Sequence, residues 1–355
     1  MEYSKLFFVL LLLVLFLIAR VAEKRNSKFL LFVICVVLCL YSGLRHMTVG
    51  IDTKNYYEII YNIDQGYGVY TNEIVFTGFC KWMMELFHSI PLIIFLMSSF
   101  TCILFVLRFW ELRERCSFPF MLLVFMGCFF LRSMNIMRQF VAIAAIFWGT
   151  RFLDQRKYIK YILTLLLAVS FHTSAVIGFA IMFVYLFRDY QKSKKTRWIL
   201  GISIVLALIG GVTLIQEVWD QYDHYFEDQT VALGLMPVYK LLIFIATCLL
   251  TGVARSRITV PERRAAAELD KTSSLLYCLG ILITCLGFFY PFMDRIGLSL
   301  LMFEIPFWGQ AIKLKSYRFF FVLMPLVFIV YEIYFQLSGN GLGIFPYHTI
   351  FWRGY

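Results

Sequence analysis

A succession of long apolar runs constrains the fold of this chain more than any other feature of its sequence. Of the 355 residues, 61% are hydrophobic and 15% are charged, whereas soluble domains are about half apolar and a quarter charged. This much apolar surface requires lipid as its solvent. Because backbone inside a bilayer must satisfy its own hydrogen bonds, the runs are expected to be helices. The sequence therefore predicts an all-α, polytopic integral membrane protein in which residues 1–355 form a single transmembrane domain.

The apolar runs recur along the whole chain and predict about 12 transmembrane helices. These helices are expected at Tyr3–Ala19, Phe29–Leu44, Ile90–Leu107, Phe118–Leu131, Ser133–Phe152, Tyr158–Phe171, Thr173–Phe187, Trp198–Ile215, Val238–Val253, Leu275–Tyr290, Ile296–Ile312 and Phe319–Phe335.

The connections between the runs alternate in charge, and this alternation predicts the orientation of the chain. Lys and Arg concentrate in every second connection, from Arg20–Lys28 to Lys313–Arg318. The connection Gln216–Pro237 has neither and is rich in Asp and Glu. Since cytoplasmic loops are enriched in Lys and Arg, both ends of the chain and the acidic loop 216–237 are expected outside. The same rule accounts for the net charge of +11, so we expect no nucleic-acid partner.

The segment Glu73–Phe87 is apolar but does not fit as a crossing. Its polar residues recur at intervals of four, at Glu73, Thr77, Lys81 and Glu85. Such a stripe is typical of a helix that lies in the membrane interface. A crossing here would also reverse the side of every later loop. We therefore expect residues 45–89 to form an outer loop that contains an interfacial amphipathic helix.

The largest cluster of polar residues inside the predicted spans comprises Arg132, Asn135, Arg138 and Gln139. Their spacing of three and four residues predicts one shared helix face. With the outer boundary near Arg132, Arg138 is expected about 9 Å deeper at 1.5 Å per residue. A lipid diphosphate would lie at that depth, and Arg can contact phosphate oxygens in pairs. Alternatively, Arg138 extends to the surface while Asn135 and Gln139 only join helices.

A second polar feature, Phe171–Ser174, separates two apolar legs whose far ends are basic. Each leg has about 14 residues and so reaches about 21 Å, less than the roughly 30 Å of a bilayer core. The tip of this hairpin is therefore expected inside the outer leaflet. His172 at the tip could exchange a proton near neutral pH. The alternative is that His172 and Ser174 only satisfy backbone groups of the turn.

A third feature is the outer loop Arg45–Tyr57, which combines a cation, a glycine, the Asp52 carboxylate and aromatic rings. Such a mixture suits sugars, although an ordinary wet loop would have the same composition. Elsewhere, Asp294–Arg295 lies at another outer tip, and Glu304 falls inside the eleventh run, where pairing with a buried Arg is expected. Asp220 and Asp223 have a spacing that suits a metal, but acidic outer loops are common and no metal site is predicted.

The three polar features together resemble the EpsG-like branch of the Wzy-type O-antigen, capsule and exopolysaccharide polymerases. The branch has Arg…Gly-x-Asp-x-x-x-Tyr after its second span, which corresponds here to Arg45, Gly50, Asp52 and Tyr56. Its middle span has Asn-x-x-Arg-Gln followed by small residues, which corresponds to Asn135, Arg138, Gln139 and Ala142. Its hairpin tip has Phe-His-x-Ser, which corresponds to Phe171, His172 and Ser174.

The resemblance covers roughly residues 20–187 and weakens toward the end of the chain. Arg295 resembles a late outer Arg of the family, but the Tyr that often follows it is absent. Pro346–Tyr347 resembles the C-terminal ending of the family.

The resemblance implies a fold like that of GT-C-like membrane glycosyltransferases and an enzyme of the bacterial plasma (inner) membrane, with its active site facing outside. Such polymerases join undecaprenyl-diphosphate-linked oligosaccharide units, and a separate chain-length regulator is a possible partner. Arg138 is expected to stabilise the leaving diphosphate without a metal or cofactor. His172 is the expected base, with Asp52 as the alternative. The other expected substrate contacts are Arg45, Tyr56, Arg132, Asn135, Gln139, Ser174 and Arg295.

Two other classes of membrane protein are compatible with the sequence. A flippase or transporter of lipid-linked sugars also has about a dozen spans and buried Arg. It predicts charges spread along a path through the bilayer, whereas most of these lie near the expected outer face. A membrane acyltransferase acting on surface glycans could also use a His residue.

Overall fold

The computed structural model describes residues 2–67, 73–188, 236–256, 269–287, 293–314, 318–337 and 342–352. Within these residues the regular structure is helical, apart from one isolated bridge between Arg45 and Thr349. The predicted all-α class is therefore confirmed. The chain divides into two compact units, of which the first comprises residues 1–176, 247–269 and 304–355. The second comprises residues 177–246 and 270–303.

The first unit contains most of the helices that carry the sequence motifs. They are α1 (Glu2–Arg25), α2 (Lys28–Gly43), α3 (Ile51–Asp64), α4 (Ile74–Phe87), α5 (Ile90–Leu112), α6 (Phe118–Phe125), the π-helix η1 (Met126–Phe130), α7 (Leu131–Asn135), α8 (Met137–Asp154), α9 (Tyr158–Phe171), α17 (Glu304–Ala311) and α18 (Arg318–Leu337).

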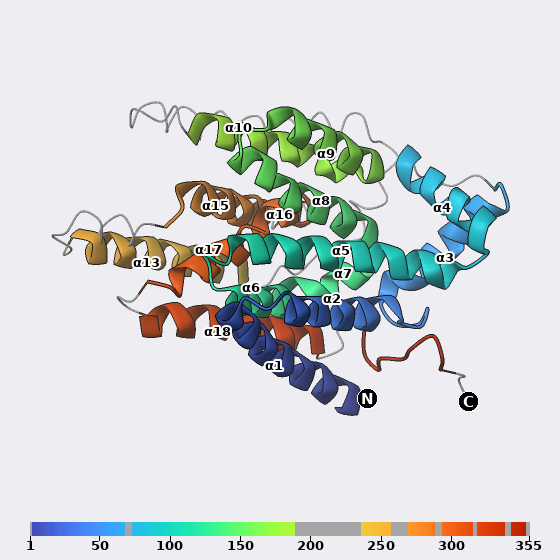
Figure 1. Cartoon of the computed structure of the whole chain (residues 1–355), viewed down its shortest axis with the longest axis horizontal. Helices are drawn as coiled ribbons and strands as arrows, with labels where there is room; N and C mark the ends of the chain where they lie inside the picture. The colour runs from blue at the N-terminus through green and yellow to red at the C-terminus, as the bar shows by residue number, and fades with distance from the viewer. Residues whose placement is uncertain are drawn as a thin grey trace. The chain divides into compact units, whose positions relative to one another are not determined.

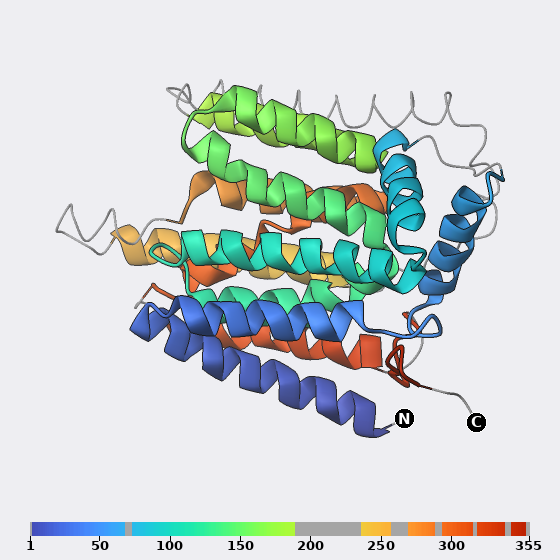
Figure 2. The ribbon, with the colours of Figure 1, turned by 45° about the vertical axis from the view of Figure 1, so that its right-hand side comes forward.

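Long helices of the first unit lie side by side (Figure 1). α1 packs on α2, α2 on α5, α5 on α8 and α8 on α9, while α6 packs on α1 and α17. The two short helices α3 and α4 contact one another and lie across one end of this layer (Figure 2). They place the outer-loop motif over the ends of α5, α7 and α9.

The second unit contains α10 (Gly178–Arg188), the first half of α13 (Met236–Ser256), α15 (Lys271–Leu286) and α16 (Met293–Leu301). α15 packs closely on α16. A Cβ atom at Gly280 would lie 2.7 Å from the backbone nitrogen of Leu301, so this approach requires a glycine, as is common between membrane helices.

Three helices are long and apolar enough to cross a membrane: Tyr3–Arg25, Ile90–Leu112 and the continuous helical segment Phe118–Asn135. Six shorter apolar helices accompany them among the residues described. The predicted run Trp198–Ile215, the acidic loop 216–237 with Asp220 and Asp223, and the connection Arg188–Arg197 beyond its first residue lie almost entirely outside those residues. The total of 12 spans stays a prediction.

A break at Ile136 corrects the prediction of one helix face for the middle cluster. Ile136 has φ −80° and ψ 54°, and it separates α7 from α8. Arg132 therefore belongs to α7, whereas Arg138 lies in the first turn of α8 rather than about two turns inside one helix. The carbonyl of Met134, which the break removes from the helical ladder, accepts a 2.9 Å hydrogen bond from Arg45 Nη2. A tertiary contact thus replaces the lost helical bond.

A second predicted span is also interrupted. The run Ile296–Ile312 contains the end of α16 at Leu301 and the start of α17 at Glu304. Glu304 is fully buried in the first turn of α17, where the helix N-terminus favours a negative charge.

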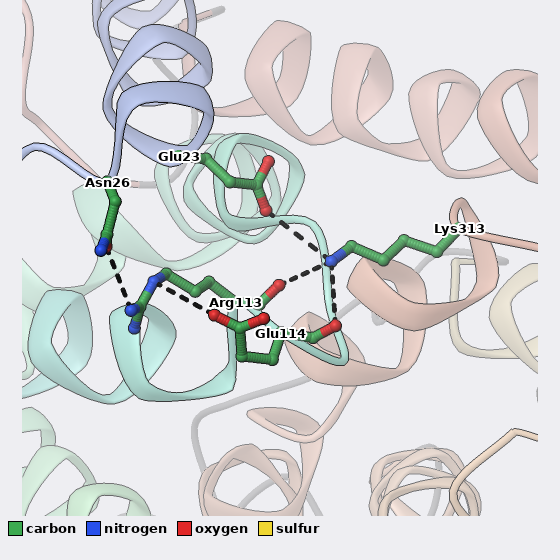
Figure 3. Close-up of a pocket in the computed structure, with 5 residues that line it drawn as sticks. All are labelled: Glu23, Asn26, Arg113, Glu114 and Lys313. Carbon is green, nitrogen blue, oxygen red and sulfur yellow. Dashed lines mark hydrogen bonds and ion pairs between the residues drawn. The ribbon is translucent and has the colours of Figure 1, made fainter.

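Basic connections of the first unit meet at the end of the helices opposite α3 and α4. Figure 3 shows Lys313 reaching the carboxylate of Glu23, at 3.8 Å, and the carbonyl oxygens of Arg113 and Glu114, at 2.6 and 3.3 Å. Arg113 in turn donates to the Asn26 side chain at 3.1 Å. These five residues line a polar cavity of about 340 Å³. Three of the connections that the charge alternation places on one side, those after α1, α5 and α17, therefore lie at one end of the first unit.

Candidate functional site

Glu73, immediately before α4, connects the two residues expected to carry the chemistry. Its Oε2 lies 2.7 Å from Arg138 Nη1, and its Oε1 lies 2.6 Å from His172 Nδ1. The Glu73 side chain is only 7% exposed, against 22% for Arg138 and 25% for His172. One buried carboxylate therefore holds the first turn of α8 and the end of α9 together, at the end of the bundle where α3 and α4 lie.

The charge state of Glu73 follows from its surroundings. Burial alone would raise its pKa, but the hydrogen bond and charge of His172, the charge of Arg138 and the backbone N–H of Thr173 together hold the pKa below its usual range. The carboxylate is therefore ionised at neutral pH and acts only as an acceptor. Because the folded pKa is lowered, the stabilisation is present at neutral pH and is lost as the pH falls through that pKa.

Aromatic rings form the wall of the site. The Arg138 guanidinium carbon lies 5.0 Å from the ring centre of Phe76 and 5.8 Å from that of Tyr56. The Phe171 ring packs edge-on against Phe76, with ring centres 5.7 Å apart. The apolar core beneath joins α3, α4, α5 and α8. Rings exclude water on one side of the ion pair and favour a cation over their faces, so they strengthen the local electrostatics.

His172 uses its backbone to form the turn that follows α9. Its N–H donates to the Ala168 carbonyl at 2.8 Å, and its own carbonyl accepts from the Ala175 N–H at 3.0 Å. Nδ1 faces Glu73, while Nε2 has no hydrogen-bond partner among the residues that the structure describes. The ring is thus fixed at one nitrogen and accessible at the other.

Arg45 follows α2 and is fully buried. Its guanidinium donates to Ser98 Oγ at 2.9 Å, Thr53 Oγ1 at 3.3 Å, Met134 O at 2.9 Å and the carbonyl of Ser42. Burial lowers its pKa to about 10, which leaves it charged at neutral pH. In this structure protein groups bind the Arg45 guanidinium, which joins α2, α3, α5 and α7. The expected contact of Arg45 with a diphosphate stays a prediction.

The surroundings of Gly50 and Asn135 show why these two motif positions require a glycine and an asparagine. Gly50 caps α3 with φ +91°, which favours glycine, and a Cβ there would lie 2.4 Å from Asn135 Oδ1. The Asn135 Nδ2 donates to Leu342 O at 2.8 Å, and the Gly50 N–H donates to Gly343 O at 2.8 Å. The segment Leu342–Trp352 thereby binds both the Gly50 motif and the Asn135 motif and links them. Asn135 Oδ1 is buried without a hydrogen-bond partner in the described chain.

Arg132 belongs to a separate polar cluster. Its Nη2 lies 3.3 Å from Glu332 Oε2 on α18. Glu332 also accepts from Gln336 Nε2 at 3.4 Å, and the same nitrogen donates to the Gly127 carbonyl at 3.4 Å within the π-helix. The structure therefore separates Arg132 from Arg138 by giving each its own carboxylate.

The remaining expected site residues occupy different surroundings. Tyr56 is buried and accepts the Arg138 backbone N–H at 3.4 Å. Asp52 lies in the first turn of α3 and is half-buried, and its charge contributes to the raised pKa of Tyr56, after burial as the main cause. Gln139 is buried on α8, Ser174 Oγ is buried in the turn after His172, and Arg295 lies on α16 in the second unit.

Glu73 is the residue that the sequence pattern does not single out. The four-residue stripe assigns it to the polar face of an interfacial helix with Lys81 and Glu85, which are exposed, but Glu73 itself is buried. The signal that could have identified it is charge balance. Arg138 falls inside a predicted span, where the dielectric is expected to be low, and a buried Arg there calls for a carboxylate nearby.

No group of three or more His, Cys, Asp or Glu side chains is placed to hold a metal within the described part of the chain. The arrangement that is present suits an anion beside Arg138 and a proton acceptor at His172.

Comparison with known proteins adds one positive result. The model of the EpsG family matches residues 28–349 of the chain. No curated protein and no solved structure matches, so the likeness to GT-C-like enzymes stays a prediction. The match includes all three motifs and also residues 342–349 of the segment that packs on Arg45 and Asn135. The chain therefore belongs to the EpsG family, and this membership points to a membrane glycosyltransferase of the polysaccharide-polymerase type.

Proposed function

We propose that this protein polymerises undecaprenyl-diphosphate-linked oligosaccharide units at the outer face of the bacterial plasma membrane, for an O-antigen, capsule or exopolysaccharide. The observation that carries the proposal is the convergence of Arg138 and His172 on Glu73. A cation and a titratable group lie together, at the end of the bundle opposite the basic connections. Family membership supports the same class of reaction.

The transfer is an exchange at the sugar carbon that carries the lipid diphosphate. The hydroxyl of an incoming unit attacks this carbon, and the bond from carbon to the diphosphate oxygen breaks with its electron pair on the oxygen. Arg138 stabilises the charge that develops on the diphosphate. The hydroxyl proton goes to Nε2 of His172, which acts as the base. Asp52 is the alternative base, since it lies near the same Tyr56.

The other motif residues have supporting roles in this proposal. Tyr56, Asn135, Gln139 and Ser174 contact the diphosphate or the sugars, or hold the groups that do. Arg132, which pairs with Glu332, keeps its predicted role as a further substrate contact. Arg45 acts on the site through the break at Ile136, because it binds the Met134 carbonyl just before that break.

The direct test is reconstitution of the purified protein with a lipid-linked repeat unit. Formation of polymer with release of the lipid diphosphate supports the proposal. The surface glycan of a deletion strain separates the other classes. Loss of a polymerase leaves single repeat units attached, loss of a flippase leaves none, and loss of an acyltransferase leaves full-length chains.

The orientation of the chain gives a prediction that does not depend on the chemistry. Lys54 on α3 and Lys157 before α9 are both exposed lysines, one beside the motifs and one at the basic end. In a background without the nine native cysteines, an impermeant maleimide should label Lys54→Cys in intact spheroplasts but not Lys157→Cys. Both variants should react after the membrane is opened. The reverse labelling pattern in intact spheroplasts would place the motif end of the protein on the cytoplasmic side.

Chelation tests whether a metal ion stabilises the leaving diphosphate. Because Arg138 supplies the positive charge at the diphosphate in this proposal, polymerisation by the reconstituted protein should persist in EDTA. Loss of activity in EDTA that magnesium or manganese restores would contradict this expectation, and would make Asp220 and Asp223 the first candidates for ligands.

A further inference from the structure

We infer that Glu73 is a positioning residue of the proposed transfer reaction, which fixes the tautomer and orientation of His172 and holds Arg138 beside it. Both contacts are shorter than 3 Å and come from the two oxygens of one carboxylate. The inference rests on the proposed function for its kinetic consequence, but the tautomer itself can be observed without substrate.

The tautomer follows from the charge state of the carboxylate. An ionised carboxylate can only accept hydrogen bonds, so the nitrogen that contacts it must carry a proton. His172 Nδ1, 2.6 Å from Glu73 Oε1, is therefore the protonated nitrogen. In a neutral imidazole the other nitrogen, Nε2, then has a free lone pair. This is the form that a general base requires.

Glu73 also stabilises the charge that appears when His172 accepts the proton. The ring becomes an imidazolium beside a carboxylate that stays ionised, so no further proton transfer is needed. Arg138 bonds the second oxygen of the same group. The cation for the leaving diphosphate and the base for the acceptor are thereby fixed relative to one another, which reduces the freedom lost on reaching the transition state.

The surroundings of Glu73 stabilise its contacts with His172 and Arg138. The Glu73 side chain is buried, and the Thr173 backbone N–H adds a third donor to the carboxylate. Removal of the carboxylate would leave Arg138 in a partly buried position without this negative charge, which is costly in a low dielectric.

The first arm of the test reads the tautomer by nitrogen NMR of purified protein labelled with ¹⁵N-histidine. The His172 signals are identified by their absence from His172→Ala. At a pH where the ring is neutral, wild-type protein should carry its proton on Nδ1. In Glu73→Leu no acceptor remains for a proton on Nδ1, so the proton should move to Nε2, the tautomer that free imidazole prefers. Glu85→Gln, which changes an exposed carboxylate on α4, should keep the wild-type pattern.

The second arm measures polymerisation with the lipid-linked unit at matched levels of inserted protein. Glu73→Gln should lower the turnover number by about 10²-fold or more, with KM changed by less than about threefold because binding is largely kept. Glu73→Asp keeps an acceptor and should recover part of the loss. A residue that only stabilises the fold would instead lower the amount of inserted protein and leave the tautomer unchanged.

An unchanged His172 tautomer in Glu73→Leu, or turnover of Glu73→Gln within about threefold of wild type, would overturn the inference. If wild-type protein forms no polymer from the lipid-linked unit, the proposed function fails, and the tautomer comparison still decides whether Glu73 sets the state of His172.

Discussion

Arg138→Lys is expected to retain about 1% or less of wild-type polymerisation, although it keeps the positive charge. A lysine ammonium is a point charge, whereas the planar guanidinium can contact Glu73 and a phosphate in different directions. Removal of one preorganised electrostatic contact in a transition state usually lowers a rate by about 10²–10³-fold. The measurement is the initial rate of polymer formation in proteoliposomes at equal protein content.

A matched control is Arg115→Lys, an exposed arginine at the basic end of the first unit. It should polymerise at the wild-type rate, because it lies in the connection between α5 and α6, directly after Arg113 and Glu114 of the polar cavity. Near-normal polymer from Arg138→Lys would mean that Arg138 supplies only charge or packing, and the role in stabilising the diphosphate would have to pass to another cation.

His172→Ala should cause a loss of similar size, about 10²-fold or more, because the acceptor hydroxyl loses its base. The protein should still insert and bind the lipid-linked substrate. His88→Asn is the control, since His88 is exposed with φ 47°, a conformation that Asn tolerates, and its activity should be unchanged.

The double variant of Arg138→Lys with His172→Ala tests whether the two residues act at one step. Groups that act together are strongly non-additive, so the double variant should be little worse than the worse single variant. Multiplied losses would indicate separate steps. Near-normal polymer from His172→Ala alone would remove it as the base and favour Asp52.

The sequence predicts the helices well where hydrophobicity alone determines them. The run Tyr158–Phe171 matches α9 at both ends, because basic residues and a polar turn delimit it. The break at Ile136 is not visible in the same way. No Pro or Gly marks the break. The Met134 carbonyl that it frees accepts a hydrogen bond from Arg45, which is far away in the sequence. A break stabilised by tertiary contacts leaves no local signal.

The outer loop shows the same limit in reverse. Residues from Ile51 onward form α3, although the mixture of polar and aromatic residues suggests an irregular loop. The burial of Tyr56, Ile60 and Ile63 on one face stabilises the helix, and this burial depends on α4. Arg138 and His172, which the motifs single out, both contact Glu73 in the structure. The link through the Glu73 carboxylate could not be predicted from the sequence. The four-residue spacing indicates only that Glu73 shares a helix face with Lys81.

The contacts of Leu342–Trp352 with Arg45–Ile51 and Asn135 determine when this site can first exist. During synthesis, α2, the α3 cap and the end of α7 leave the ribosome long before residue 342 does. Until then the N–H groups of Gly50 and Ile51 and the side chain of Asn135 lack the acceptors that residues 342 and 343 provide, and unsatisfied groups of this kind are costly. Assembly is therefore a late, long-range event. A chain arrested before residue 342 would be inserted yet inactive, and catalysis cannot begin on an unfinished protein.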